Sequence, residues 1–182
     1  MTRHKGRAAA WFAAGAIAAL GVVIAPRFVR ADGSDSAAER LQRVEDRQEI
    51  EELFTAYGAT LDRRDFDAFG RLFAEEAVYA GGPGTPVHGR AAIQALLQQQ
   101  ITSNPSHLPA PDFHLYFNPS IQVDGNRAVA SSKGAYIIPD LANNGARIVF
   151  FVTYDDTLIR REGRWVFMSR TIHGGIPAPK SK

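Results

Sequence analysis

Residues 57–67 read Tyr57-Gly58-Ala59-Thr60-Leu61-Asp62-Arg63-Arg64-Asp65-Phe66-Asp67, and this stretch joins two amphipathic patterns that decide the fold. Apolar residues precede it at helical spacing and predict a helix from about Ser36 to Leu61. A shorter pattern follows and predicts a second helix from Asp65, its N-cap, to about Glu75. Both helices need a surface on which to bury their apolar faces. Because the rest of the chain is mostly strand, we expect that surface to be a sheet.

A short strand and a third helix are predicted just after this junction. The strand is Ala77–Ala80, and glycine and proline residues then force a loop over residues 81–86. The third helix is marked by an apolar stripe at Ile93, Leu96, Leu97 and Ile101. The segment 102–112 contains three prolines and is expected to be irregular.

From Phe113 onward the apolar period changes to two, which predicts strands. Turn signals at 124–126, 139–145 and 161–163 divide this region into two hairpins. We expect Pro119 to interrupt the first strand as a bulge or an edge. The predicted strands are Phe113–Val123, Arg127–Ile138, Arg147–Ile159 and Arg164–His173. This order of elements predicts an α+β fold, with the helices gathered on one side of an antiparallel sheet.

The composition limits the function classes. With 182 residues and 45% hydrophobic content, the chain can bury one core, which predicts one domain. Five of the 21 basic residues and none of the acidic ones lie in residues 1–31, so the body carries 16 basic against 19 acidic residues. No nucleic-acid partner is expected from that balance. The absence of cysteine from the sequence excludes disulfides, thiolate catalysis and cysteine-based metal sites.

The first 31 residues have the layout of a secretory signal peptide. Three basic residues precede an apolar run from Ala8 to Ala25, and Val29-Arg30-Ala31 supplies a small residue for cleavage. The run is also long enough to span a bilayer, so an uncleaved N-terminal anchor is the alternative. We expect the body to be exported, either periplasmic or secreted after cleavage, or membrane-anchored and facing outward. The predicted layout is a leader (1–31), a linker (32–38), a folded domain (39–173) and a disordered tail (174–182).

Short motifs follow one another along residues 40–173 in an order that is typical of one family. They include Leu61-Asp62-Arg63-Arg64-Asp65-Phe66-Asp67, Leu72-Phe73-Ala74-Glu75-Glu76-Ala77-Val78-Tyr79, Gly89-Arg90-Ala91-Ala92-Ile93, His114-Leu115-Tyr116-Phe117-Asn118, Ile121-Gln122-Val123-Asp124-Gly125-Asn126-Arg127-Ala128 and Tyr154-Asp155-Asp156. On these motifs the body resembles the SnoaL-like branch of the nuclear-transport-factor-2-like (NTF2-like) superfamily. Members of that superfamily include polyketide cyclases, scytalone dehydratase, ketosteroid isomerase and limonene epoxide hydrolase, together with many non-catalytic domains.

The resemblance implies a cone-shaped α+β barrel. In that fold a strongly curved antiparallel sheet wraps around three N-terminal helices and leaves a pocket for a small, mostly apolar molecule. Relatives often pair through the exposed face of the sheet, so a homodimer is expected. The sequence departs from the family at Val152, where a glycine is common, and the larger side chain is expected to narrow the pocket.

Two catalytic residues, Asp62 and His114, are implied by the resemblance, because dehydratase-like and cyclase-like relatives keep acid/base residues at these positions. A carboxylate and an imidazole held together in an apolar pocket can remove a proton next to a carbonyl and return it to a leaving hydroxyl. Helical periodicity places Asp62 at the margin of the apolar stripe. A solvated residue at a helix end is therefore the alternative for Asp62.

Strand alternation places His114, Tyr116 and Asn118 on one face, opposite three apolar residues. That face is predicted to line the pocket, and the alternative is that the apolar face packs on the helices while His114 meets water. Substrate contacts are predicted for Tyr57, Tyr79, Tyr116, Asn118 and His88. For the tyrosines the alternative is a buried core position with a satisfied hydroxyl, and for His88 it is a purely structural role.

Two functions are compatible with these patterns. The favoured one is an exported, cofactor-independent lyase or isomerase that acts on a small apolar cyclic molecule through an Asp–His acid/base pair. The alternative is a non-catalytic domain that binds a small ligand or a partner. No phosphate-binding loop, metal-binding histidine spacing or Gly-x-Ser-x-Gly elbow is present in the sequence, so neither a cofactor nor a metal is expected.

Overall fold

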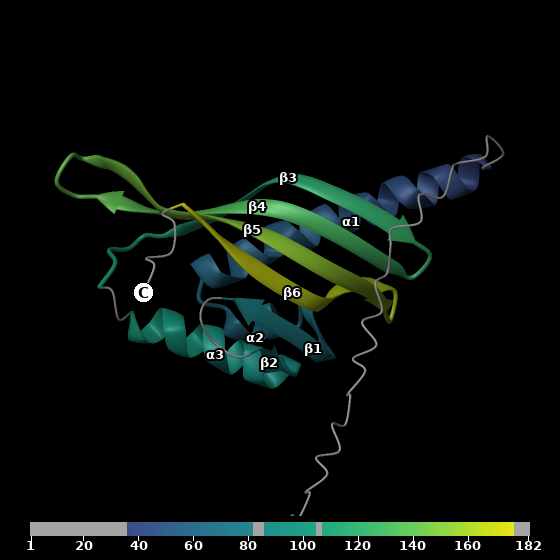
Figure 1. The fold of residues 1–182 in the computed structure, drawn as a ribbon, viewed down its shortest axis with the longest axis horizontal. Coiled ribbons are helices and arrows are strands. Elements are labelled where there is room, and N and C mark those ends of the chain that lie inside the picture. The colour runs from purple at the N-terminus through teal and green to yellow at the C-terminus, as the bar shows by residue number, and fades with distance from the viewer. Residues whose placement is uncertain (1–35, 82–85, 105–106, 177–182) are drawn as a thin grey trace, which may run out of the picture. The chain divides into compact units, whose positions relative to one another are not determined.

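A computed structural model describes residues 36–81, 86–104 and 107–176 of the chain. The predicted leader, the start of the linker and the end of the tail lie outside these residues and stay predictions. In chain order the elements are α1 (Ala37–Asp62), α2 (Phe66–Gly70), β1 (Phe73–Gly81), β2 (Val87–His88), α3 (Arg90–Ser103), β3 (Phe113–Asp124), β4 (Arg127–Asp140), β5 (Gly145–Arg161) and β6 (Arg164–Ile176) (Figure 1). None of the helices in the described ranges is long and apolar enough to cross a membrane.

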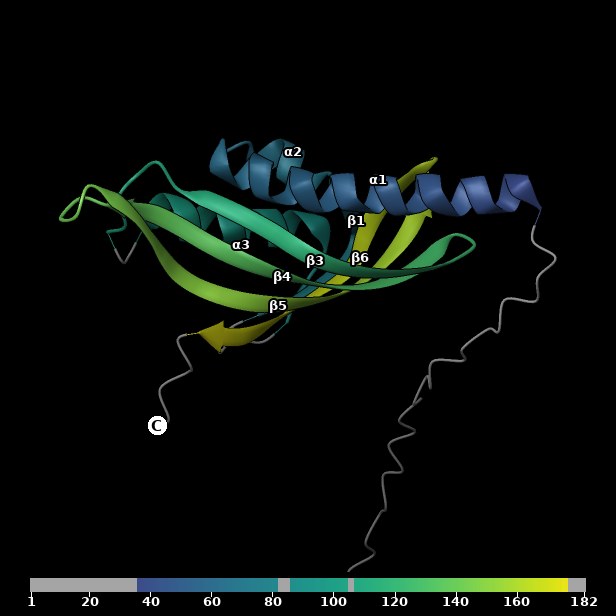
Figure 2. The same ribbon diagram turned by 90° about the horizontal axis from the view of Figure 1, so that it is seen from above.

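The strands form one six-stranded sheet in the order β2-β1-β6-β5-β4-β3. The helices lie on one face of this curved sheet, as predicted (Figure 2). The predicted α+β class is confirmed, but the sheet is mixed and open, because β1 pairs with β6 in the parallel direction. β1 lies beside β6, the last strand of the β3–β6 meander, although β2, α3 and three strands separate the two in the chain, so no hairpin connects them.

The helix boundaries follow local capping chemistry. Ser36 caps α1 through a capping box with Glu39, and Asp65 caps α2 by accepting a hydrogen bond from the backbone N–H of Ala68 at 2.9 Å. The second helix ends at Gly70 rather than near Glu75, which corrects the prediction. Residues from Phe73 onward pair with β6 instead, because strand pairing buries Phe73 completely.

The ends of the last strands also differ from the prediction. β4 and β5 each extend further into the predicted loop 139–145, because they pair as far as Asp140 and Gly145. β6 continues to Ile176, so residues 174–176 belong to the sheet rather than to a disordered tail. The backbone of Phe151 holds this extension by pairing with Ile176. The predicted tail begins no earlier than residue 177.

The close approach of α1 to β3 depends on Gly58. A Cβ atom added at this position would lie 2.9 Å from the backbone oxygen of His114 and 3.1 Å from Cε2 of Tyr116. Both distances are shorter than ordinary van der Waals contact, and the nearer atom belongs to the backbone. Glycine is therefore required here although it lowers helix propensity. The contact sets how the C-terminal end of α1 sits on the sheet.

A buried ion pair lies among the aromatic rings of the core. Arg170 on β6 is fully buried, and its guanidinium binds both carboxylate oxygens of Asp156 at 2.8 Å. Burial opposes the charged form, but the carboxylate of Asp156 keeps the pKa of Arg170 above its ordinary value. The guanidinium carbon also lies 4.1–5.5 Å from the centres of five aromatic rings, those of Phe54, Tyr57, Tyr116, Tyr154 and Phe167.

Gly58→Ala is expected to destabilise the protein by about 1–3 kcal/mol, because the added methyl group overpacks the contact between α1 and β3. Helix propensity alone predicts a gain of up to about 1 kcal/mol, so the sign of the change is diagnostic. The matched control is Ala59→Gly, which should cost roughly 0.5–1 kcal/mol in the ordinary direction. Urea unfolding followed by circular dichroism measures both, and a stabilised Gly58→Ala variant would contradict the close contact.

Asp156→Asn should destabilise the protein by about 3–5 kcal/mol, because it leaves the guanidinium of Arg170 buried without a counter-charge. Glu76→Gln is the matched control, since it breaks the exposed ion pair between Glu76 and Arg161 and should change stability little. Chemical denaturation of the two variants side by side makes the comparison. Equal small effects would mean that the Asp156–Arg170 pair carries no net stability.

Candidate functional site

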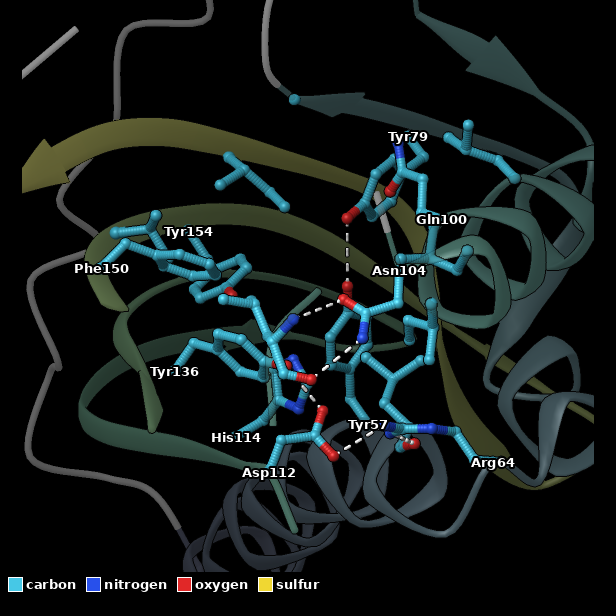
Figure 3. A pocket seen from close by; sticks show the side chains of 18 of the residues that line it. Tyr57, Arg64, Tyr79, Gln100, Asn104, Asp112, His114, Tyr136, Phe150 and Tyr154 are labelled. Atoms are coloured by element: carbon cyan, nitrogen blue, oxygen red, sulfur yellow. Dashed lines mark hydrogen bonds and ion pairs between the residues drawn. The ribbon is translucent and has the colours of Figure 1, made fainter. Parts of the chain in front are cut away.

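A cavity of about 600 Å³ opens between α3, the end of α1 and the sheet. Its walls are mostly apolar, with Leu96, Leu97 and Ile101 from α3 facing Phe150, Val152 and Ile172 from the sheet. Figure 3 shows two polar groups of side chains in it. His114, Asp112 and Tyr136 gather on one wall, and the hydroxyl groups of Tyr57 and Tyr79 meet on another. Gln100 and Asn104, at the end of α3, add further polar groups, so the cavity offers an apolar volume with polar groups at several points of its wall.

His114 and Asp62 are in direct contact. Nδ1 of His114 lies 2.7 Å from Oδ1 of Asp62, and the same oxygen accepts the backbone N–H of His114 at 3.1 Å. Asp62 is the last residue of α1 and His114 the second residue of β3, so this contact joins the helix to the sheet. Both side chains are largely buried, with 22% of Asp62 and 14% of His114 exposed.

The two residues differ in their access to the cavity. His114 lines it, whereas Asp62 is not among the lining residues. A carboxylate beside Nδ1 favours the tautomer that carries its proton on Nδ1, which leaves the lone pair on Nε2. Among the described residues Nε2 has no hydrogen-bond partner. Of the face that was predicted to line the pocket, His114 lines the cavity, and Asp62 lies behind its imidazole rather than in the cavity.

Four tyrosines on and beneath the cavity floor form two hydroxyl pairs. The hydroxyls of Tyr57 and Tyr79 lie 3.2 Å apart, and Tyr116 donates to Tyr154 at 3.3 Å. Burial raises the pKa of Tyr79 to about 12 and raises that of Tyr57 well above its ordinary value. These hydroxyls therefore stay protonated at neutral pH. Tyr57, Tyr79 and Tyr154 line the cavity, whereas Tyr116 packs behind it.

Besides Tyr116, the other two predicted substrate contacts, Asn118 and His88, also lie outside the cavity. Asn118 is exposed because a bulge at Asn118 and Pro119 places two residues of β3 opposite one of β4 and ends the alternation. Asn118 has a positive φ of 52° at this point. The bulge expected at Pro119 is confirmed. His88 is exposed on the two-residue strand β2 at the edge of the sheet, because it pairs there with Val78.

Asp112, which the sequence patterns did not single out, supplies a carboxylate to the cavity wall. Its side chain is only 6% exposed and accepts hydrogen bonds of 2.7 Å from Nη2 of Arg64 and from the hydroxyl of Tyr136. Burial alone would raise the pKa of the Asp112 carboxyl, but these two donors lower it below its ordinary value. Asp112 is thus ionised at neutral pH beside the ring of Tyr136.

Metal binding has no support in the part of the chain that the structure describes. No group of three or more histidine, aspartate or glutamate side chains in these ranges could hold a metal ion. Two polar side chains of the cavity instead form pairs with a charged partner, His114 with Asp62 behind it and Asp112 with Arg64. Such pairs suit proton transfer and hydrogen bonding to an organic molecule.

The sequence profile of the SnoaL-like domain matches residues 42–171. The chain belongs to the SnoaL-like domain family. Uncharacterized proteins of Mycobacterium tuberculosis and Mycobacterium bovis are 27% identical to it over 139 residues, which is 75% of this chain and 90% of each relative. The family match confirms the resemblance to SnoaL-like proteins that the sequence motifs indicated.

Solved structures show the same fold. An NTF2-like protein with a cystatin-like fold from Novosphingobium aromaticivorans is 25% identical, with a TM-score of 0.68, over 80% of this chain and 94% of that chain. A protein from the same organism, provisionally described as a scytalone dehydratase, is 21% identical with a TM-score of 0.63 over 75% and 89%. ActVI-ORFA from Streptomyces coelicolor is 19% identical with a TM-score of 0.63 over 72% and 96%.

Asp112→Asn is expected to cost about 1–3 kcal/mol of stability at pH 7, because the Arg64 and Tyr136 donors lose a charged acceptor. Since the folded-state pKa of Asp112 is depressed, its contribution is complete above the unfolded value of about 3.9 and is lost as pH falls through the lower folded value. The difference between wild type and variant should therefore shrink between about pH 5 and pH 3. Denaturation curves across that range test it, and a constant difference would contradict it.

Proposed function

We propose that this SnoaL-like protein is a cofactor-independent lyase or isomerase that acts on a small, mostly apolar cyclic hydroxy ketone. The proposal is carried by the contact between His114 and Asp62 at the cavity wall, which leaves Nε2 of His114 without a hydrogen-bond partner among the residues that the structure describes. An imidazole oriented by a carboxylate is a competent general base and, once protonated, a general acid. The apolar walls suit a mostly apolar substrate.

The reaction would begin with proton abstraction. Nε2 of His114 takes a proton from the carbon next to the ketone, and the electron pair of that C–H bond moves to the carbonyl oxygen as an enolate. A protonated tyrosine hydroxyl of the pair Tyr57 and Tyr79 donates a hydrogen bond to that oxygen. Asp62 stabilises the imidazolium that forms, because its carboxylate lies 2.7 Å from Nδ1.

The second step would return the same proton. The enolate re-forms the carbonyl, a carbon–carbon double bond forms, and the hydroxyl on the neighbouring carbon leaves with the proton of the imidazolium as water. Where the substrate has no such hydroxyl, returning the proton to another carbon gives an isomer. The similarity to a solved structure provisionally described as a scytalone dehydratase supports the first of these outcomes.

His114→Ala is expected to lower kcat/KM by about a hundredfold or more, because it removes the proton-transferring group. Asp62→Asn should lower kcat with little change in KM, since Asp62 contacts His114 and not the cavity. The probes are β-hydroxy ketones fused to an aromatic ring, whose loss of water appears as a new ultraviolet absorption, and 1-tetralone, whose uptake of deuterium from solvent is read by mass spectrometry.

His88→Ala is the matched control, because this histidine is exposed and lies outside the cavity. It should leave both reactions unchanged, and all three variants should keep the circular dichroism spectrum of the wild type. If the wild-type protein binds the ketones yet neither exchanges nor dehydrates them, the catalytic proposal fails and the protein is a ligand-binding domain. The same conclusion follows if His114→Ala retains full turnover.

A further inference from the structure

The end of α1 is tied to β4 by a chain of three side chains that the proposed reaction does not use. Nη1 of Arg64 donates to the backbone oxygen of Leu61 at 2.7 Å, which fixes the guanidinium against the last turn of α1. Nη2 of Arg64 donates to Asp112, and Asp112 accepts the hydroxyl of Tyr136 on its other oxygen. Each link is a short hydrogen bond to a charged group, so Tyr136 is held at its far end.

The ring of Tyr136 lies between two other rings. Tyr136 pairs across the sheet with His114 on one side and with Phe150 on the other. Its ring centre is 4.7 Å from that of His114, with an interplanar angle of 37°, and 5.3 Å from that of Phe150, with an angle of 24°. Figure 3 shows Asp112, Tyr136 and His114 together on one wall of the cavity. The imidazole of His114 therefore rests against a ring that cannot turn freely.

Two contacts are needed to fix an imidazole. The hydrogen bond from Nδ1 of His114 to Asp62 holds one edge of the ring, but the ring can still tilt about this contact through small changes in χ1 and χ2. The ring of Tyr136, which lies against the imidazole at 37°, limits this tilt and so restricts where Nε2 points. We propose that Tyr136 and Asp112 are positioning residues for His114, with Arg64 and Asp112 holding the ring of Tyr136 in place. The inference rests on the proposed function, because it concerns the proton transfer at the same site.

The hydroxyl of Tyr136 is the part of this arrangement that can be removed cleanly. Tyr136→Phe keeps the ring and its packing against His114 and Phe150 but removes the bond to Asp112. Asp112→Asn keeps the size of the side chain but weakens the bonds to both Arg64 and Tyr136. Tyr116→Phe is the matched control, because it removes a phenol hydroxyl that bonds to Tyr154, and Tyr116 itself does not line the cavity.

The first measurement needs no substrate. The ¹⁵N chemical shifts of the His114 ring in the full-length protein report its tautomer and whether the ring exchanges between orientations. In the wild type we expect one sharp pair of signals with the proton on Nδ1. Tyr136→Phe and Asp112→Asn should broaden or shift these signals, whereas Tyr116→Phe should not. Unchanged His114 signals in both Tyr136→Phe and Asp112→Asn would overturn the inference.

The second measurement uses the β-hydroxy ketone probes. Tyr136→Phe should lower kcat by about 10- to 100-fold with KM unchanged, because a misaligned base affects the reacting geometry and not substrate binding. A rise in KM at constant kcat would instead make Tyr136 a substrate contact and would overturn the positioning role. If the wild type shows no turnover, the proposed function fails, but the ring signals of His114 still decide whether Tyr136 and Asp112 position it.

Discussion

The contact between the last turns of α1 and the start of β3 is the constraint on which the rest of the structure depends. Because residue 58 has no side chain, the helix can lie directly against the backbone of His114. Only at that separation can the carboxylate one turn later, that of Asp62, reach both the backbone N–H and Nδ1 of the same histidine. One turn of helix therefore decides both how the layers pack and where the imidazole is held.

The floor of the cavity carries neutral tyrosine hydroxyls on the cavity side and packs against a buried positive charge on the other side. Tyr57 and Tyr154 line the cavity, and the guanidinium of Arg170 lies 4.2 Å and 4.5 Å from the centres of their rings. Burying that charge is costly, and the bidentate pair with Asp156 together with the ring faces offsets the cost. The hydroxyls above it remain protonated, so the floor can donate hydrogen bonds without carrying a charge itself.

Much of this arrangement could be predicted from the sequence, because helix periodicity and strand alternation are local. The bounds of α1, the α+β class and the inward face of His114 follow from those two periods. Alternation failed at Asn118, where the expected bulge ends it. Alternation would also fail at Arg170. Counting from the turn at residues 162–163 would pair Asp156 with Ser169, but a bulge at Met168 shifts the register by one residue, so that Asp156 pairs with Arg170. Asp112 lies in an irregular segment without any period.

The bulges at Asn118–Pro119 in β3 and at Met168 in β6 each shift the inward–outward alternation of their strand by one residue, and a further shift follows near the end of β6. Between the hairpin tip and the bulge, the inward-facing residues are every second residue from the tip. Beyond the bulge, on the side of the cavity, they are every second residue from the bulge. A substitution that changes the lining of the cavity beyond a bulge therefore leaves the alternation beside the hairpin tip as it is. The bulges thus uncouple the pairing that holds the hairpins from the set of side chains that the cavity presents.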